Sequence, residues 1–188
     1  MRKLISFVHI SLDGFVAGPK GEMDWITINE EIFDYVGELL HPIDTALYGR
    51  VTFEMMEGYW PSAADRPHAT RHDIEHARWY KKANKIVLSR SLEGKSFSHS
   101  TIISSDVAGK IRNLKQASGS DIVIFGSPGA THSLMKEDLV DGYWLFVNPI
   151  ILGKGIPLFA EIKDRTKLKL AESKKFLSGV VALQFGKD

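Results

Sequence analysis

The stretch from Asp121 to Thr131, DIVIFGSPGAT, holds the residues whose types and spacing most clearly suggest chemistry. Its apolar, β-branched first half is typical of a strand, and helical spacing of apolar residues resumes after the two glycines. A strand that leads into a helix N-terminus presents backbone N–H groups and the positive end of the helix dipole, and Gly126 and Gly129 let an anion approach the backbone closely. The pattern predicts a phosphate site. The alternative is a packing turn, because tight strand-to-helix turns also use glycine.

Two more predicted strands end in residues that suit a phosphate. Gly49, Arg50 and Thr52 lie where a strand gives way to a helix, so a guanidinium and a hydroxyl belong to the same first turn. Ser89 and Arg90 follow another predicted strand. Arginine suits phosphate because its planar, permanently charged fork matches the phosphate oxygens, although an ordinary surface arginine is the alternative at each place.

Three strand ends of this kind indicate one extended ligand. In an open α/β sheet the carboxyl ends of the strands border the ligand crevice, so we expect a molecule with several phosphates, most simply a dinucleotide. Two separate arginines near phosphate-sized sites favour NADP over NAD, because NADP carries the extra 2′-phosphate.

A long glycine-spaced loop, residues 11–27, follows the first predicted strand. A loop of this kind can fold over a bound ligand and exclude water, which benefits hydride transfer. The alternative is a simple connection with Trp25 as its hydrophobic anchor.

The elements that must position these residues follow from the apolar pattern. Strands are predicted where β-branched runs recur, at residues 4–12, 45–48, 85–88, 101–103, 122–125 and 143–151. Helical periodicity lies between several of them, which predicts an α/β fold with a mixed, mainly parallel sheet and helices on both faces. Residues 167–176 and 180–187 flank a Leu-Ser-Gly turn and predict a C-terminal antiparallel hairpin. We expect Pro149 at an edge or bulge, and a surface loop from Pro61 to Thr70.

Composition restricts the class of protein. With 188 residues and 44% apolar content, we expect one domain over residues 1–188. The net charge of +1, without a basic block, indicates neither nucleic acid nor an anionic membrane as partner. The absence of cysteine excludes disulfides, thiolate metal sites and thiol nucleophiles, and we expect a cytoplasmic protein.

Taken in order, the short motifs resemble a known family. They are SLDG at residues 11–14, WIT at 25–27, GRVTF at 49–53, VLS at 87–89, FGS at 125–127 and LFVNPIILGKGIPLF at 145–159. Together they resemble the dihydrofolate reductase-like superfamily, and more closely stand-alone proteins similar to the reductase domain at the C-terminus of the bifunctional riboflavin-biosynthesis protein RibD. The resemblance covers nearly the whole chain and implies a dihydrofolate reductase-like fold.

The resemblance also implies roles for particular residues. The residues that it assigns to NADPH binding are Ala17, Gly18, Gly49, Arg50, Thr52, Ser89, Arg90, Gly126, Ser127, Gly129, Ala130 and Thr131. It places the loop from Asp13 to Thr27 against nicotinamide and substrate, and it brings residues 148–155 to the opposite wall of the cleft. Trp25, Leu152 and Gly153 are then expected to contact the substrate.

The proton donor is less clear, because the chain departs from the family pattern at two places. Dihydrofolate reductases have two adjacent glycines at the pyrophosphate turn, whereas residues 126–129 here are Gly-Ser-Pro-Gly. They also place a carboxylate on the first helix, where this chain offers Glu30, Glu31 and Asp34. Glu31 borders the apolar helix face and is the preferred donor, with a solvated carboxylate as the alternative. Asp13 is the rival donor, with a turn-forming side chain as the alternative.

His68, His72 and His76 recur at every fourth residue outside this resemblance. On a helix His72 and His76 would share a face and could chelate a metal, but no second shell is evident. We expect an exposed polar face and predict no metal.

The sequence thus predicts an NADPH-dependent reductase that transfers hydride to a pteridine-like or ribosylaminopyrimidine-like small molecule. The alternative is a non-catalytic NADP(H)-binding sensor or regulatory protein on the same scaffold. The apolar C-terminal strands, residues 180–185, favour a homodimer.

Overall fold

The structure, a computed structural model, describes residues 1–160, 162 and 164–187. The chain divides into two units, one made of Met1–Arg2 with Ile28–Val123 and the other of Lys3–Thr27 with Ile124–Asp188. Strand β6 (Ile122–Phe125) gives its first two residues to the first unit and its last two to the second. The single domain expected for residues 1–188 stays a prediction.

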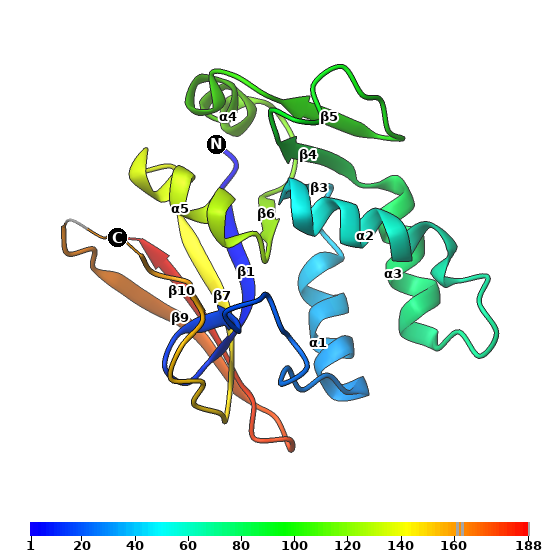
Figure 1. Cartoon of the computed structure of the whole chain (residues 1–188), viewed down its shortest axis with the longest axis vertical. Coiled ribbons are helices and arrows are strands. Elements are labelled where there is room, and N and C mark those ends of the chain that lie inside the picture. The colour runs from blue at the N-terminus through cyan, green and yellow to red at the C-terminus, as the bar shows by residue number, and fades with distance from the viewer. Residues whose placement is uncertain (161, 163, 188) are drawn as a thin grey trace. The chain divides into compact units, whose positions relative to one another are not determined.

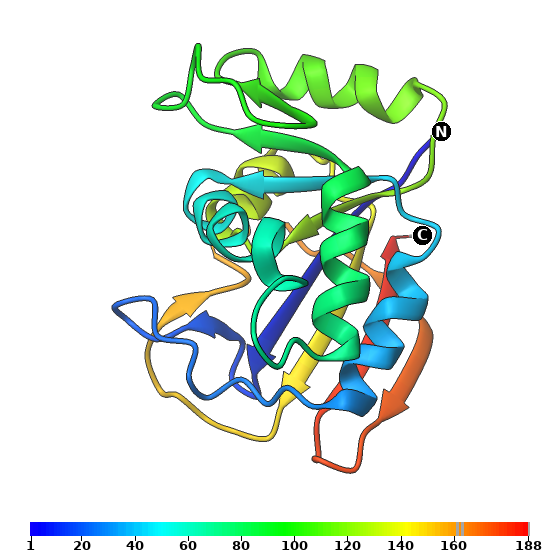
Figure 2. The ribbon, with the colours of Figure 1, turned by 90° about the vertical axis from the view of Figure 1, so that its right-hand side faces the viewer.

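The first unit holds three parallel strands and four helices (Figure 1). Its strands follow the order β5-β4-β3, and β6 comes next. Figure 2 shows α1 and α3 side by side. The elements are α1 (Glu30–Leu40), β3 (Thr45–Gly49), α2 (Arg50–Ala63), α3 (Arg71–Lys82), β4 (Asn84–Leu88), β5 (Ser100–Ile103) and α4 (Val107–Gln116).

Local sequence explains the bounds of these helices. Helix α1 buries Ile32, Val36 and Leu40 along one face, and the side chain of Asn29 caps its N-terminus by accepting a hydrogen bond from the Ile32 N–H at 3.0 Å. Helix α3 begins with a capping box in which Thr70 and Asp73 each bond the other's backbone N–H. Both helices are therefore held at their N-termini by their own side chains.

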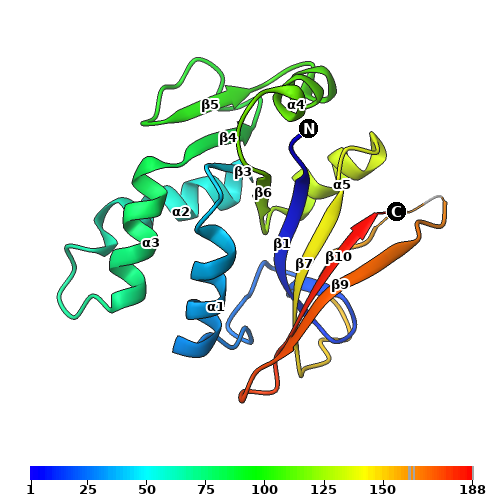
Figure 3. The ribbon, with the colours of Figure 1, turned by 180° about the vertical axis from the view of Figure 1, so that it is seen from behind.

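The second unit is built on strands β1 (Leu4–Ser11) and β7 (Gly142–Asn148), which pair in parallel. Strands β10 (Val181–Lys187) and β9 (Leu168–Lys175) continue the sheet in antiparallel pairing, as the view from behind shows (Figure 3). The short strands β2 (Phe15–Ala17) and β8 (Ile156–Pro157) form a separate antiparallel pair, and α5 (Pro128–Lys136) follows β6.

Aromatic rings fill much of the core of the second unit. The Phe7 ring centroid lies 5.3 Å from those of both Phe125 and Phe146, and Phe146 is 1% exposed. Phe176, just after β9, stacks on Phe146 at 6.2 Å. Because alternate residues of a strand point to opposite sides, these rings and His9 share one side of the sheet.

The predicted α/β fold, with its mixed, mainly parallel sheet and C-terminal antiparallel hairpin, is confirmed. Pro149 directly follows the last residue of β7, where its missing N–H costs no ladder bond. The loop predicted from Pro61 begins later, because α2 continues through Pro61 to the buried Ala63. Strands β2 and β8 were not predicted, since two or three residues show no periodicity.

Strand β9 stands at the end of the strand order and is exposed along most of its length. Lys169, Lys174 and Lys175 place positive charge on it, which opposes pairing with another chain through this edge. The homodimer expected from the C-terminal strands stays a prediction. Within the described ranges, no helix has the length and apolar character needed to cross a bilayer.

Candidate functional site

The turn before α5 has an unusual backbone. Gly126 and Ser127 both adopt the left-handed conformation, with φ of 51° and 49°, and Pro128 then starts the helix. Glycine tolerates this conformation, whereas serine adopts it at a cost. The Gly126 N–H donates to the Phe7 carbonyl at 2.9 Å, which ties the turn to β1.

This geometry leaves the N-terminus of α5 without a side-chain cap. Gly129 is exposed, and a Cβ added there would meet no atom within 4 Å. The N–H groups of Gly129 and Ala130 belong to the first helical turn, where an α-helix supplies no partner of its own. Backbone donors and the helix dipole are therefore available to an anion at this terminus.

Thr131 has a different environment from its neighbours in the turn. Its side chain is fully buried, its Oγ1 lies 3.5 Å from Ser6 Oγ, and its N–H donates to the Ser127 carbonyl at 3.0 Å. These contacts pack α5 against β1. The hydroxyl predicted to bind cofactor is thus directed into the second unit rather than toward its surface.

The N-terminus of α2 also lacks a side-chain cap, with Gly49 in an extended conformation at the N-cap. Arg50 is exposed and forms an ion pair with Glu54, one turn along, at 2.6 Å. Thr52 is half-buried in the first turn. A phosphate at this terminus would meet backbone N–H groups and a guanidinium whose exposed partner can be displaced at small cost.

Ser89 and Arg90 line a cavity of about 360 Å³ in the first unit. Ser104, Ser105 and Asp106 also contribute to its lining, so three hydroxyls and one guanidinium face one space together with one carboxylate. Asp106 accepts a hydrogen bond from the Gly109 N–H at 3.3 Å as the cap of α4. Hydroxyls and arginine suit a phosphate. The negative charge of Asp106 would repel one, but its carboxylate is partly engaged by the Gly109 N–H.

Asp13 connects two loops of the second unit. Its carboxylate accepts hydrogen bonds from the Ser11 hydroxyl at 2.6 Å and from the N–H groups of Leu152 at 3.1 Å and Gly153 at 2.8 Å. The Ser11 hydroxyl is the largest cause of the lowered pKa of Asp13, and the two N–H groups add to it. An ionised carboxylate with these partners suits the turn-forming alternative better than proton donation.

The loops beside Asp13 pack closely. Gly155 lies so close to the backbone of Ala17 that a Cβ there would collide with the Ala17 carbonyl oxygen and press on the Phe15 ring, and Ala17 pairs with Ile156 across β2 and β8. Gly18 is buried, and its N–H donates to the Glu22 carbonyl at 2.9 Å. Leu152 and Gly153, predicted to contact substrate, therefore lie in a segment anchored to the first loop.

Trp25 is half-buried, and its indole N–H donates to the Glu22 carbonyl at 3.1 Å. Two residues later, the Thr27 N–H donates to Asn148 Oδ1 at 2.9 Å. Asn148 is 1% exposed, so this bond holds the end of the loop at the carboxyl end of β7. An asparagine just before Pro149 at the end of an apolar run was the only signal of this role in the sequence.

Arg71 pairs with two of the three carboxylates of α1 that were candidates for the proton donor. It forms ion pairs with Asp34 and, at 3.8 Å, with Glu30, and all three side chains are exposed. Glu31 is half-buried. The structure thus assigns two of the candidates to surface ion pairs, and Glu31 stays the predicted proton donor.

His72 and His76 lie on α3, as the spacing predicted, but the face that they share is covered by aromatic rings. The Phe33 and His72 rings stack at 3.5 Å between centroids, and Trp60 lies 4.1 Å from His76. Burial lowers the pKa of both histidines, that of His76 to about 3. The expected exposed polar face is therefore wrong for this pair. In the described part of the chain, no three metal-binding side chains form a cluster suited to an ion.

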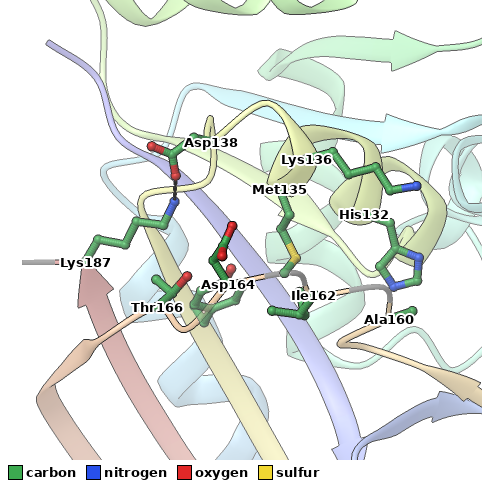
Figure 4. A pocket seen from close by; sticks show the side chains of 10 residues that line it. His132, Met135, Lys136, Asp138, Ala160, Ile162, Asp164, Thr166 and Lys187 are labelled. Carbon is green, nitrogen blue, oxygen red and sulfur yellow. Dashed lines mark hydrogen bonds and ion pairs between the residues drawn. The ribbon is translucent and has the colours of Figure 1, made fainter.

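A further cavity of about 550 Å³ lies within the second unit, next to the second half of α5 (Figure 4). His132 Nε2 lies 3.1 Å from the Pro157 carbonyl oxygen and 2.8 Å from that of Leu158, which joins α5 to the end of β8 and the residue after it. Lys187 and Asp138 form an ion pair at 2.6 Å on the opposite wall. Of the predicted site residues in the described chain, none lines this cavity.

Comparison with known proteins gives consistent results. The family model of the RibD C-terminal domain matches residues 2–182. The uncharacterized protein YyaP of Bacillus subtilis (strain 168) is 31% identical over 186 residues, which cover 98% of this chain and 94% of that protein.

Two solved structures share the fold. A Shewanella sp. PV-4 protein, whose name assigns it provisionally to riboflavin biosynthesis, superposes with a TM-score of 0.74 at 21% identity, covering 99% of both chains. The Thermotoga maritima diaminohydroxyphosphoribosylaminopyrimidine deaminase/5-amino-6-(5-phosphoribosylamino)uracil reductase superposes with a TM-score of 0.68 at 18% identity. The match covers all of this chain and 57% of the Thermotoga maritima protein.

Proposed function

Because the chain belongs to the RibD C-terminal domain family, we propose that the protein is an NADPH-dependent reductase that transfers hydride to a ribosylaminopyrimidine-like or pteridine-like small molecule. The uracil reductase activity in the name of the Thermotoga maritima protein supports the pyrimidine class. NADPH, when bound, supplies the hydride, so the protein must bind, orient and shield the reacting groups.

The observation that carries the proposal is the state of the helix N-termini. Helices α1, α3 and α4 are capped by the side chains of Asn29, Thr70 and Asp106. Helices α2 and α5 have no side-chain cap, and these are the two whose first turns were predicted to bind phosphates. Uncapped N-termini leave backbone donors for a ligand anion.

The residues present suit NADPH in each unit. In the second unit, Gly129 and Ala130 would hold the pyrophosphate through backbone N–H groups, with Gly126 shaping the turn before them and room for an anion beside the exposed Gly129. In the first unit, Arg50 at the start of α2 would bind phosphate. The serines and Arg90 of the 360 Å³ cavity would bind the 2′-phosphate.

The second unit also offers residues for the substrate. Asp13 holds Leu152 and Gly153 in place through their N–H groups, so the two loops are joined to each other. We propose that these loops exclude water from the reacting carbon and that Glu31 supplies the proton that completes reduction.

The non-catalytic alternative is favoured by one observation, the arrangement at Asp13. Its carboxylate is already hydrogen bonded, which leaves Glu31 as the remaining predicted donor. A sensor would bind NADPH as an enzyme does but would not oxidise it with any substrate.

The first test is titration with NADPH and, separately, NADH, followed by tryptophan fluorescence and confirmed by calorimetry. We expect selective binding of NADPH and its oxidation in the presence of 5-amino-6-(5-phosphoribosylamino)uracil. Arg50→Ala should weaken NADPH binding about tenfold, because a charge-assisted contact is lost. Arg78→Ala, which removes an exposed arginine of α3, is the control and should leave binding unchanged.

The outcomes separate the two functions. NADPH binding without oxidation, with dihydrofolate also tested, would support the sensor. If neither dinucleotide binds, both forms of the proposal fail.

A further inference from the structure

His9 lies on β1, two residues before the strand ends at Ser11. Its ring stacks on Phe146 with 4.9 Å between centroids and 26° between planes, and Phe7 meets it edge-on at 6.4 Å. Two aromatic neighbours therefore fix the plane of the imidazole. A histidine held in this way at the carboxyl end of a central strand lies where α/β proteins bind their ligands.

Asn148 determines which ring nitrogen of His9 carries the proton. The amide is oriented by backbone groups, since Oδ1 accepts from the Thr27 N–H and Nδ2 donates to the carbonyls of Phe146 at 3.1 Å and Ile10 at 3.3 Å. Nδ2 also lies 3.4 Å from His9 Nδ1. Nδ2 carries two hydrogens for three acceptors, so its contact with Nδ1 shares a hydrogen with one of the carbonyls. A proton on Nδ1 would point at these same N–H groups, so the network assigns the proton to Nε2.

Nε2 is the only polar atom of the ring left for another partner. Among the described residues, His9 has no hydrogen bond other than the one with Asn148, and its side chain is half-buried. Burial lowers the pKa of His9 to about 4, so the ring is neutral at physiological pH. The result is a neutral N–H donor, fixed in orientation, on a half-buried side chain.

The surroundings of His9 belong to the candidate site. Phe7, two residues earlier, accepts the hydrogen bond that anchors the Gly126 turn to β1. Ser11, two residues later, begins the loop that Asp13 holds. Thr27, at the end of that loop, bonds the same asparagine that orients His9.

We propose that His9 is a substrate-contacting residue whose Nε2–H donates a hydrogen bond to a carbonyl oxygen of a planar heterocycle. This inference rests on the proposed reductase function and narrows its substrate class. A neutral donor suits a neutral acceptor, such as a ring carbonyl of a uracil. A ring with an amino group at that position would place two donors against each other and would be rejected.

Steady-state kinetics with saturating NADPH and 5-amino-6-(5-phosphoribosylamino)uracil test the proposal. His9→Phe keeps a flat ring against Phe146 but removes the donor, and we expect KM to rise about tenfold with kcat changed less than about threefold. His9→Gln restores an N–H donor and should recover KM to within about threefold of the wild-type value. His41→Gln, an exposed histidine after α1, is the control and should behave as wild type.

Nuclear magnetic resonance of the imidazole nitrogens gives a readout that needs no turnover. We expect the Nε2–H tautomer for His9 at neutral pH, and a shift of its Nε2 signal when the uracil compound is added. A proton on Nδ1, or a His9→Phe variant with wild-type KM in a protein that binds NADPH and turns over, would overturn this inference alone. If the protein binds neither NADPH nor the uracil compound, the reductase function fails and this inference with it.

Discussion

Helices α3 and α5 both have a hydroxyl residue at the N-cap, yet their N-termini are built differently. Thr70 is extended, and its hydroxyl accepts a hydrogen bond from the Asp73 N–H at 3.1 Å within a capping box. Ser127 is left-handed, and its side chain makes no cap bond. The difference teaches that a hydroxyl residue at the N-cap does not by itself seal a helix: Thr70 closes its first turn, whereas Ser127 leaves the first turn of α5 for a ligand.

The surroundings of the two helices differ in the same way as their N-termini. Helix α3 places His76 among the rings of Trp60 and Trp79, so it contributes packing to the first unit. Helix α5 leaves Gly129 exposed in its first turn. We therefore expect changes in α3 to alter stability without altering NADPH binding, and changes in the first turn of α5 to do the reverse.

The largest expected effect is the dependence of stability on pH through His76. The pKa of His76 is lowered to about 3 in the folded protein, whereas in the unfolded chain it is near 6.5. As the pH falls below about 6.5, the imidazole is therefore protonated in the unfolded chain while it is still neutral in the folded protein, which favours unfolding. Its contribution to stability is complete above about pH 7 and is lost as pH falls, by about 3 kcal/mol at pH 4. Denaturant unfolding of wild type and His76→Gln at pH 7 and pH 4 measures this.

His76→Gln cannot titrate, so its loss of stability between the two pH values should be smaller than that of wild type by about this amount. Equal losses in both proteins would contradict the assigned environment of His76. NADPH affinity at pH 7 should be the same in both.

A negative charge in the first turn of α5 should give the next largest effect. Gly129→Asp has room for its side chain, and its carboxylate should repel the cofactor phosphates, lowering NADPH affinity about a hundredfold. The same charge interacts favourably with the helix dipole, so the thermal midpoint should not fall. Calorimetric titration and thermal unfolding measure the two quantities.

Gly129→Asn is the matched neutral control and should retain most of the affinity. A Gly129→Asp variant that bound NADPH as tightly as wild type would show that α5 does not bind the phosphates.

The smallest expected effect is at the capping box of α3. Thr70→Ala removes the hydroxyl that accepts from Asp73, which should reduce the free energy of unfolding by about 1 kcal/mol and leave NADPH affinity unchanged. Thr70→Ser keeps the oxygen and should lose much less. Loss of NADPH affinity in Thr70→Ala would remove the contrast between the two helices.

Much of the fold could be predicted from the sequence because its strands carry strong apolar runs. The runs at residues 45–48 and 122–125 match β3 and β6 closely, since each is mainly apolar and is followed directly by a glycine. The end of α2 was missed because Pro61 normally marks a helix end, whereas here burial of Ala63 supports two more residues.

The candidate site was less predictable because its geometry depends on contacts between distant residues. The glycines showed where a turn would form, but the left-handed conformation of Ser127 has no sequence signature. Asp13 was placed correctly in a loop, yet its partners at Leu152 and Gly153 lie far along the chain. His9 could be taken only as part of a strand until its contacts with Asn148 were known.

The bonds from Asp13 also bear on how the protein folds. They join residues that are 139 and 140 positions apart, so they cannot form until β7 has paired with β1. Contacts of such long sequence separation form slowly, because a large loop must be closed before any of them is gained. On a ribosome, the first loop would be complete long before its partner emerged, and we expect the substrate end of the site to be among the last parts of the protein to become ordered.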